Sequence, residues 1–92
     1  MSIKITNGAT REVQVAVSFW YTDSDVSDTY YPLKPGDGEG WKRNDSRGYL
    51  MTIKGQSQAG VYYVAFDSEI LIEDNRVKDR GETLTRLSLQ AQ

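Results

Sequence analysis

The chain has 92 residues, a net charge of −2, and neither cysteine nor histidine. This length suits one small domain with a single core, and the lack of thiols excludes disulfides and thiolate metal sites. Without histidine, the commonest general base and the commonest metal ligand are both missing, which disfavours Ser-His-Asp catalysis and catalytic zinc. Basic residues are scattered rather than clustered, so we expect no nucleic-acid partner.

The hydropathy pattern predicts where in the cell the protein resides. No apolar run approaches the roughly 20 residues of a membrane span. The first residues read as a strand rather than as a charged region followed by an apolar one, so we expect no signal peptide. The sequence therefore predicts a cytoplasmic protein, or one released by a non-classical route, with no membrane span.

The first two expected strands cover residues 2–6 and 11–21. Asn7-Gly8 between them is a strong hairpin signal, so we expect these two strands to pair. Strict alternation in the second strand predicts that Trp20 lies on the face away from the core, near the strand's end. The residues expected to face the core are Val13, Val15, Val17, Phe19 and Tyr21.

An acidic loop follows, with Asp23, Asp25 and Asp28. Its spacing resembles a fragment of a calcium-binding loop but lacks the glycine and terminal glutamate of an EF-hand. Two interpretations stay open here: a structural cation site, or a plain solvated turn.

Further strands are expected at short, regular intervals. Residues 61–66 form a continuous apolar run that predicts a strand covered on both faces, and residues 74–81 read as a loop or an extended hairpin tip. The other expected strands are residues 30–33, 39–43, 49–54, 69–73 and 83–90. The pattern predicts one domain over residues 1–92, an all-β, small antiparallel β-sandwich of six to eight strands.

Residues 30–49 concentrate the chemistry of the chain. The segment holds both prolines, and Pro35-Gly36 predicts a chain reversal. Trp41 and Arg43 then share one face of a strand, and a polar loop follows them directly. Sugars are bound by an aromatic plate together with amides, carboxylates and guanidinium groups that bond pairs of hydroxyls.

This chemistry predicts a sugar site. The stacking residue would be Trp41 or, failing it, Trp20 or Tyr21. Asn44 and Asp45 would bind two ring hydroxyls, and Arg43 and Arg47 would donate to others. Asp37 and Tyr30 are further candidates that could come near this site. The alternative is that Trp41 is a core tryptophan, with Arg43 stacked on it or paired with an acidic neighbour.

Catalysis is not expected. An enzyme of this composition would have to use carboxylates, tyrosine or lysine, and the scheme to consider is carboxylate-pair hydrolysis, with Asp37 and Glu39 or Asp23 and Asp25 as acid and base. Nothing in the sequence indicates the burial that would raise the pKa of one carboxyl in either pair. We therefore expect no enzyme and no cofactor.

Two resemblances enter at this point. The order of a strand, Tyr31-Pro32-Leu33-Lys34-Pro35-Gly36, a strand, Arg47-Gly48-Tyr49-Leu50, a strand and then Val61-Tyr62-Tyr63-Val64 is similar to the β-domain of the von Hippel-Lindau tumour suppressor. That likeness implies a sandwich fold over residues 3–72. It implies no function, because that family's peptide site needs a histidine.

The second resemblance covers essentially the whole chain. The chain resembles small mushroom fruiting-body lectins in its size, in its lack of cysteine and in the expected absence of a signal peptide. It also resembles them in the opening over residues 7–17 and in Leu33-Lys34-Pro35-Gly36, Trp41 and Arg43. Those lectins bind α-galactosyl sugars such as galabiose. The resemblance implies a fungal, non-covalent homodimer that binds terminal α-galactosyl glycans without catalysis.

A different class of function stays open beside the lectin. A β-sandwich with exposed tyrosines can also bind a protein or peptide along a free strand edge.

Overall fold

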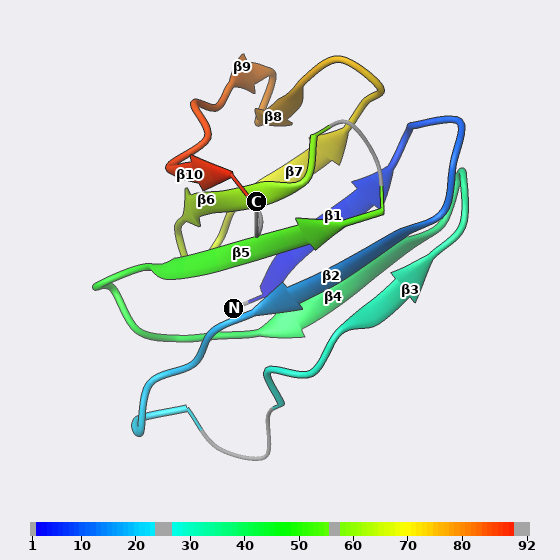
Figure 1. Cartoon of the computed structure of the whole chain (residues 1–92). Helices are drawn as coiled ribbons and strands as arrows, with labels where there is room; N and C mark the ends of the chain where they lie inside the picture. The colour runs from blue at the N-terminus through cyan, green and yellow to red at the C-terminus, as the bar shows by residue number, and fades with distance from the viewer. Residues whose placement is uncertain (1, 24–26, 56–57, 90–92) are drawn as a thin grey trace.

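Two five-stranded sheets pack face to face in the computed structural model, which describes residues 2–23, 27–55 and 58–89 (Figure 1). Sheet A contains, in spatial order, β4 (Gly38–Lys42), β1 (Ser2–Asn7), β7 (Glu69–Ile72), β8 (Val77–Asp79) and β9 (Glu82–Thr83). Sheet B contains β10 (Ser88–Leu89), β6 (Gly60–Val64), β5 (Tyr49–Lys54), β2 (Val13–Val17) and β3 (Tyr31–Leu33). The all-β sandwich is confirmed, and none of the described segments is a helix long and apolar enough to cross a bilayer.

The core lies between the sheets because the strands alternate as the sequence predicts. Ile3 and Ile5 from sheet A meet Val15 and Ile53 from sheet B, and all four are fully buried. Burying such a side chain stabilises the fold by about 1.5 to 3 kcal/mol. The other core residues are Val13, Val17, Leu33, Trp41, Tyr49, Met51, Tyr62, Val64, Ile70, Ile72 and Val77.

The predicted hairpin at Asn7-Gly8 is wrong. β1 pairs with β4 antiparallel and with β7 parallel, whereas β2 lies in the other sheet. Asn7 is fully buried, and its amide donates to the carbonyls of Arg11 and Leu33 and accepts from Ala9. This side chain holds a crossover between sheets, a role that local turn statistics do not distinguish from a hairpin.

The second strand is shorter than predicted. β2 ends at Val17, and Phe19 and Tyr21 are 46% and 89% exposed instead of facing the core. The reason is a turn in which the Asp23 N–H donates to the Trp20 carbonyl and the Asp23 carboxylate accepts from the Trp20 N–H. The alternation of side chains stops where this turn begins.

Two predictions about the later strands also need correction. β6 is not covered on both faces, because Tyr63 points away from the core and is 51% exposed. The strand expected at residues 83–90 is interrupted: Leu84 N–H still bonds to Val77 in sheet A, while Leu87 N–H bonds to Val61 in sheet B. The chain changes sheets between them, and Gln90 lies outside the described residues.

Residues 74–81, expected to be a loop or an extended hairpin tip, contain a strand, because β8 pairs with β7 and with β9. The tip between β8 and β9, Arg80-Gly81, has φ values of 51° and 87°. Positive φ at both positions is the pattern of a type I′ two-residue hairpin loop. β8 and the division of the last strand raise the number of strands in the described residues to ten, above the six to eight expected.

Candidate functional site

Trp41 belongs to the core and not to a sugar-stacking surface. It is 8% exposed, pairs with Ile3 in sheet A and meets Tyr31 edge-on, with ring centroids 6.0 Å apart. The expectation that Trp41 stacks on a ligand is therefore corrected in favour of the alternative that the sequence left open. The reason is that an inward position on β4 places the indole between the sheets.

Arg43 is also internal, at 1% exposure. Its guanidinium donates to four backbone carbonyls, those of Val17, Ser18, Ser27 and Lys42, at 2.7–2.9 Å. Burial lowers the pKa of Arg43, and the nearby Asp23 carboxylate opposes that shift. With its donors so engaged, Arg43 ties the end of β2 to the loop before β3 and is not available to a sugar.

Asp23 joins this internal network. Its carboxylate accepts from the N–H groups of Trp20 and Asn44 and from the Tyr49 hydroxyl. Burial alone would raise the pKa of Asp23, but these hydrogen bonds outweigh it and hold the pKa below its ordinary value. Asp23 therefore fixes the end of sheet B where the loops after β2 and β4 meet.

Five of the predicted site residues do come together on the surface at that end. The Cζ atom of Arg47 lies over the ring of Trp20, 3.6 Å from its centroid, and is 5.9 Å from the centroid of the Tyr21 ring. Asn44 and Asp45 precede Arg47 in the same loop. We call Trp20, Tyr21, Asn44, Asp45 and Arg47 the aromatic–arginine cluster.

Asp45 holds Arg47 in place. Its two carboxylate oxygens accept from Nε and Nη2 of Arg47 at 2.9 and 2.6 Å, and they also accept the Arg47 N–H and the Thr22 hydroxyl. The Arg47 side chain, its backbone N–H and Thr22 keep the pKa of Asp45 well below its ordinary value. Since these donors already occupy the carboxylate, Asp45 is better placed to orient Arg47 than to bind a sugar hydroxyl as predicted.

Trp20 is fixed from the other side of the loop. Its indole N–H donates to the Gly48 carbonyl at 2.7 Å, and the Tyr63 hydroxyl donates to the Arg47 carbonyl at 3.2 Å. Gly48 has φ of 89°, and a Cβ there would meet the Tyr63 hydroxyl. Gly48 and Tyr63 are supports that sequence reasoning missed, because their contact depends on the register between β5 and β6, which the sequence alone does not give.

Asp37 and Tyr30, the remaining predicted site residues, lie elsewhere. Asp37 belongs to the turn before β4, where its carboxylate accepts from the Lys34 N–H at 3.4 Å. Tyr30 receives the Lys54 ammonium 4.1 Å from its ring centroid. Lys54 ends β5, whereas Gly48 precedes it, so Tyr30 contacts the opposite end of that strand from the aromatic–arginine cluster.

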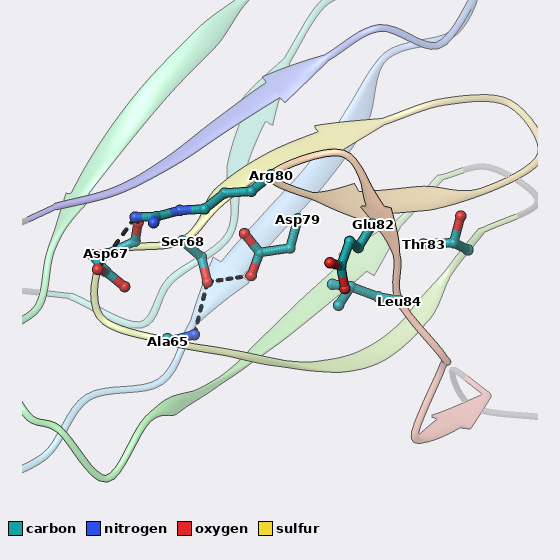
Figure 2. A pocket seen from close by; sticks show the side chains of 8 residues that line it. All are labelled: Ala65, Asp67, Ser68, Asp79, Arg80, Glu82, Thr83 and Leu84. Carbon is teal, nitrogen blue, oxygen red and sulfur yellow. Dashed lines mark hydrogen bonds and ion pairs between the residues drawn. The ribbon is translucent and has the colours of Figure 1, made fainter.

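A separate hollow of about 390 Å³ lies beside the turns around β7 and β8 (Figure 2). Four of its polar side chains are paired within the hollow, those of Asp67, Ser68, Asp79 and Arg80. The buried Ser68 hydroxyl donates to Asp79 at 2.6 Å and accepts from the Ala65 N–H, and Arg80 bonds to Asp67. These contacts hold the turns together. They give the short Ser68–Asp79 contact a structural role, so it is no reason to propose a catalytic site.

The acidic loop shows no cation site within its described part. Asp23 is engaged by the donors given above, and Asp25 lies outside the described residues. Over residues 2–23, 27–55 and 58–89, no three acidic side chains gather where they could hold a metal ion.

No protein-family model, curated protein or solved structure matches this chain. The site's own geometry therefore carries the functional proposal.

Proposed function

We propose that this protein is a non-catalytic carbohydrate-binding protein and that the aromatic–arginine cluster is its sugar site. Tyr21 carries the proposal, because it is 89% exposed and sits beside an arginine clamped in a fixed orientation. A large aromatic ring held in water needs a reason, and stacking on the C–H face of a sugar is one.

The cluster supplies the two kinds of contact that a sugar needs. The open ring of Tyr21 is the plate, since one face of Trp20 is covered by Arg47. The hydrogen bonds of Arg47 to Asp45 use Nε and Nη2, and within the described residues Nη1 has no partner. Nη1 can therefore donate to a sugar hydroxyl. Because Asp45 and Trp20 already hold the guanidinium in place, little further side-chain entropy is lost when the sugar binds.

Galactosyl glycans are the sugar class we propose, on the resemblance to mushroom lectins described above. The site is an open surface, so a single galactose should bind with a Kd of about millimolar to tens of micromolar. Biological avidity would then require two linked sites, as a homodimer provides.

A glycan array with the purified chain tests the proposal. Selective signal on galactose-terminated glycans, competed by free galactose, is expected. No binding to any glycan at high protein concentration would reject a sugar-binding role. Binding that is equal for wild type and Tyr21→Ala would reject this site while leaving a sugar-binding role in place.

A further inference from the structure

We propose that the free edge of β4 binds an extended peptide segment of alternating apolar and acidic residues as an added strand of sheet A. β4 is an edge strand of sheet A, with β1 as its one neighbour in the sheet. The hairpin of β8 and β9 forms the opposite edge of the same sheet (Figure 1). This inference is independent of the proposed sugar site, since none of the cluster residues belongs to β4.

The backbone groups available at this edge can be assigned from the hydrogen bonds of β1. The Asn7 N–H donates toward β4, to Asp37, whereas the Lys4 N–H donates toward the other side, to Ser68. Since successive residues of a strand alternate in direction, the residues opposite Lys4 and Thr6 turn their N–H and C=O groups outward. Those residues are Gly40 and Gly38. Lys42, opposite Ser2, follows the same alternation, but its carbonyl already accepts from Arg43 Nη1.

A contact at Gly40 confirms the direction of its N–H. This N–H is bonded by the carboxylate of its own neighbour, Glu39, at 3.2 Å. An incoming peptide carbonyl would replace that carboxylate. Proteins usually protect exposed sheet edges against pairing with another chain, and at Gly40 the group that occupies the edge is the Glu39 carboxylate.

The two glycines are not required by backbone conformation. Neither Gly38 nor Gly40 is among the described residues with positive φ. A Cβ on Gly40 would come no closer than 3.9 Å to Ser2, whereas one on Gly38 would lie 3.2 Å from the Thr6 hydroxyl oxygen. Glycine in a strand costs stability, and it commonly marks close approach by another backbone or a ligand. Glycine occupies two of the three outward-bonding positions of β4, the third being Lys42, and its use at Gly38 and Gly40 favours close approach by a second chain there.

Depressions flank β4 on both faces, as an added strand with alternating side chains requires. On the inner side, a depression of about 280 Å³ is lined by Tyr31, Trp41, Gly40 and neighbouring polar residues. On the outer side, one of about 400 Å³ lies over Gly38 and Gly40 and reaches Lys4 and Thr6. The aromatic wall suits an apolar side chain of the peptide.

Positive charge on the outer face of β4 favours an acidic side chain at the outward-facing positions of the peptide. Lys4 lies directly across Gly40 on the outer face, and Lys42 is exposed on the same face. Among the described residues neither lysine forms an ion pair. Because Gly40 has no side chain, an aspartate or glutamate opposite it can reach the Lys4 ammonium.

The test is a titration of the ¹⁵N-labelled chain with a seven-residue acetylated and amidated peptide of alternating valine and aspartate. Shifts and slowed hydrogen exchange at the Gly38 and Gly40 amides are expected. A lysine-for-aspartate peptide should bind about three- to tenfold more weakly, and a backbone N-methylated peptide should not bind. Lys4→Glu should reverse the preference between the two charged peptides.

Gly40→Val gives the sharpest variant, because it should fold at least as well as wild type but fill the outer depression. It should weaken peptide binding about tenfold, while Thr52→Val on the outer face of sheet B leaves binding unchanged. Absence of shifts at Gly38 and Gly40 would overturn the proposal. So would concentration-dependent shifts of these amides without peptide, which would assign the edge to a second copy of the chain.

Discussion

The guanidinium of Arg47 lies 3.6 Å from the centre of the Trp20 ring while Asp45 holds its Nε and Nη2. An arginine side chain normally samples many rotamers, and ordering it on binding costs free energy. In this protein the stacked ring and the paired carboxylate remove that cost before any ligand arrives. The first prediction follows from this arrangement.

Arg47→Ala should weaken galactose binding about tenfold or more while leaving the urea midpoint of unfolding nearly unchanged, because exposed ion pairs add little stability. Isothermal titration and urea denaturation measure the two quantities. Arg76→Ala, which removes another exposed pair, with Glu73, is the matched control and should leave sugar binding intact. An Arg47→Ala chain that binds galactose as wild type does would remove Arg47 from the site.

Arg43 should behave in the opposite way. Arg43→Met removes the donors of four carbonyls inside the fold. Leaving these groups unpaired should lower the free energy of unfolding by about 3 kcal/mol. Urea denaturation with Arg47→Ala alongside compares the internal arginine with the surface one. A loss below about 1 kcal/mol would contradict the structural role given to Arg43.

Substituting two glycines, Gly36 and Gly48, should distinguish the cost of backbone strain from the cost of a steric clash. Gly36 and Gly48 share φ of 89°, but a Cβ meets nothing within 4 Å at Gly36 and meets Tyr63 at Gly48. Gly36→Ala should cost about 1 kcal/mol from its conformation alone. Gly48→Ala should cost clearly more and should also weaken sugar binding, since it displaces the supports of Trp20 and Arg47. Equal unfolding free energies for the two variants would contradict the close packing of Gly48.

Acid should destabilise the protein through Asp23. Its pKa in the folded chain lies below the ordinary 3.8, so its stabilising effect is complete above that value and is lost as pH falls through the folded pKa. Urea denaturation between about pH 6 and pH 2 should show this loss. Asp23→Asn should be less stable at pH 6 and should lose less on acidification. An equal acid response in both proteins would rule out Asp23 as a contributor.

Fluorescence should distinguish the two tryptophans. Trp20 lies in the aromatic–arginine cluster and Trp41 lies in the core. A sugar that changes emission in wild type should do so in Trp41→Phe and not in Trp20→Phe. A response that instead disappears with Trp41 would place the ligand near β4.

The strand pattern was predictable because each strand has a local period. Ile3 and Ile5, and Val13 through Val17, alternate as a half-buried sheet should. What the sequence could not reveal is which sheet each strand joins. Asn7-Gly8 has the chemistry of a hairpin, yet the buried Asn7 amide bonds to Leu33, 26 residues away.

The candidate site was predicted in part for a related reason. Asn44, Asp45 and Arg47 are neighbours in sequence, and Trp20 and Tyr21 joined them because the loops meet at one end of sheet B. Trp41 on β4 and Arg43 just after it both point to the same side, as predicted, but that side is the interior. Period-two alternation predicts which residues of a strand share a face, but it does not predict which of the two faces is buried.

Titration of galactose into wild type, Tyr21→Ala and Tyr30→Ala tests the central claim most directly. Both tyrosines are exposed, but Tyr30 contacts Lys54 at the far end of β5 from the cluster. The account predicts that Tyr21→Ala weakens binding about tenfold and that Tyr30→Ala binds as wild type does. Unchanged binding by Tyr21→Ala, or an equal loss in both variants, would contradict a sugar site at the aromatic–arginine cluster.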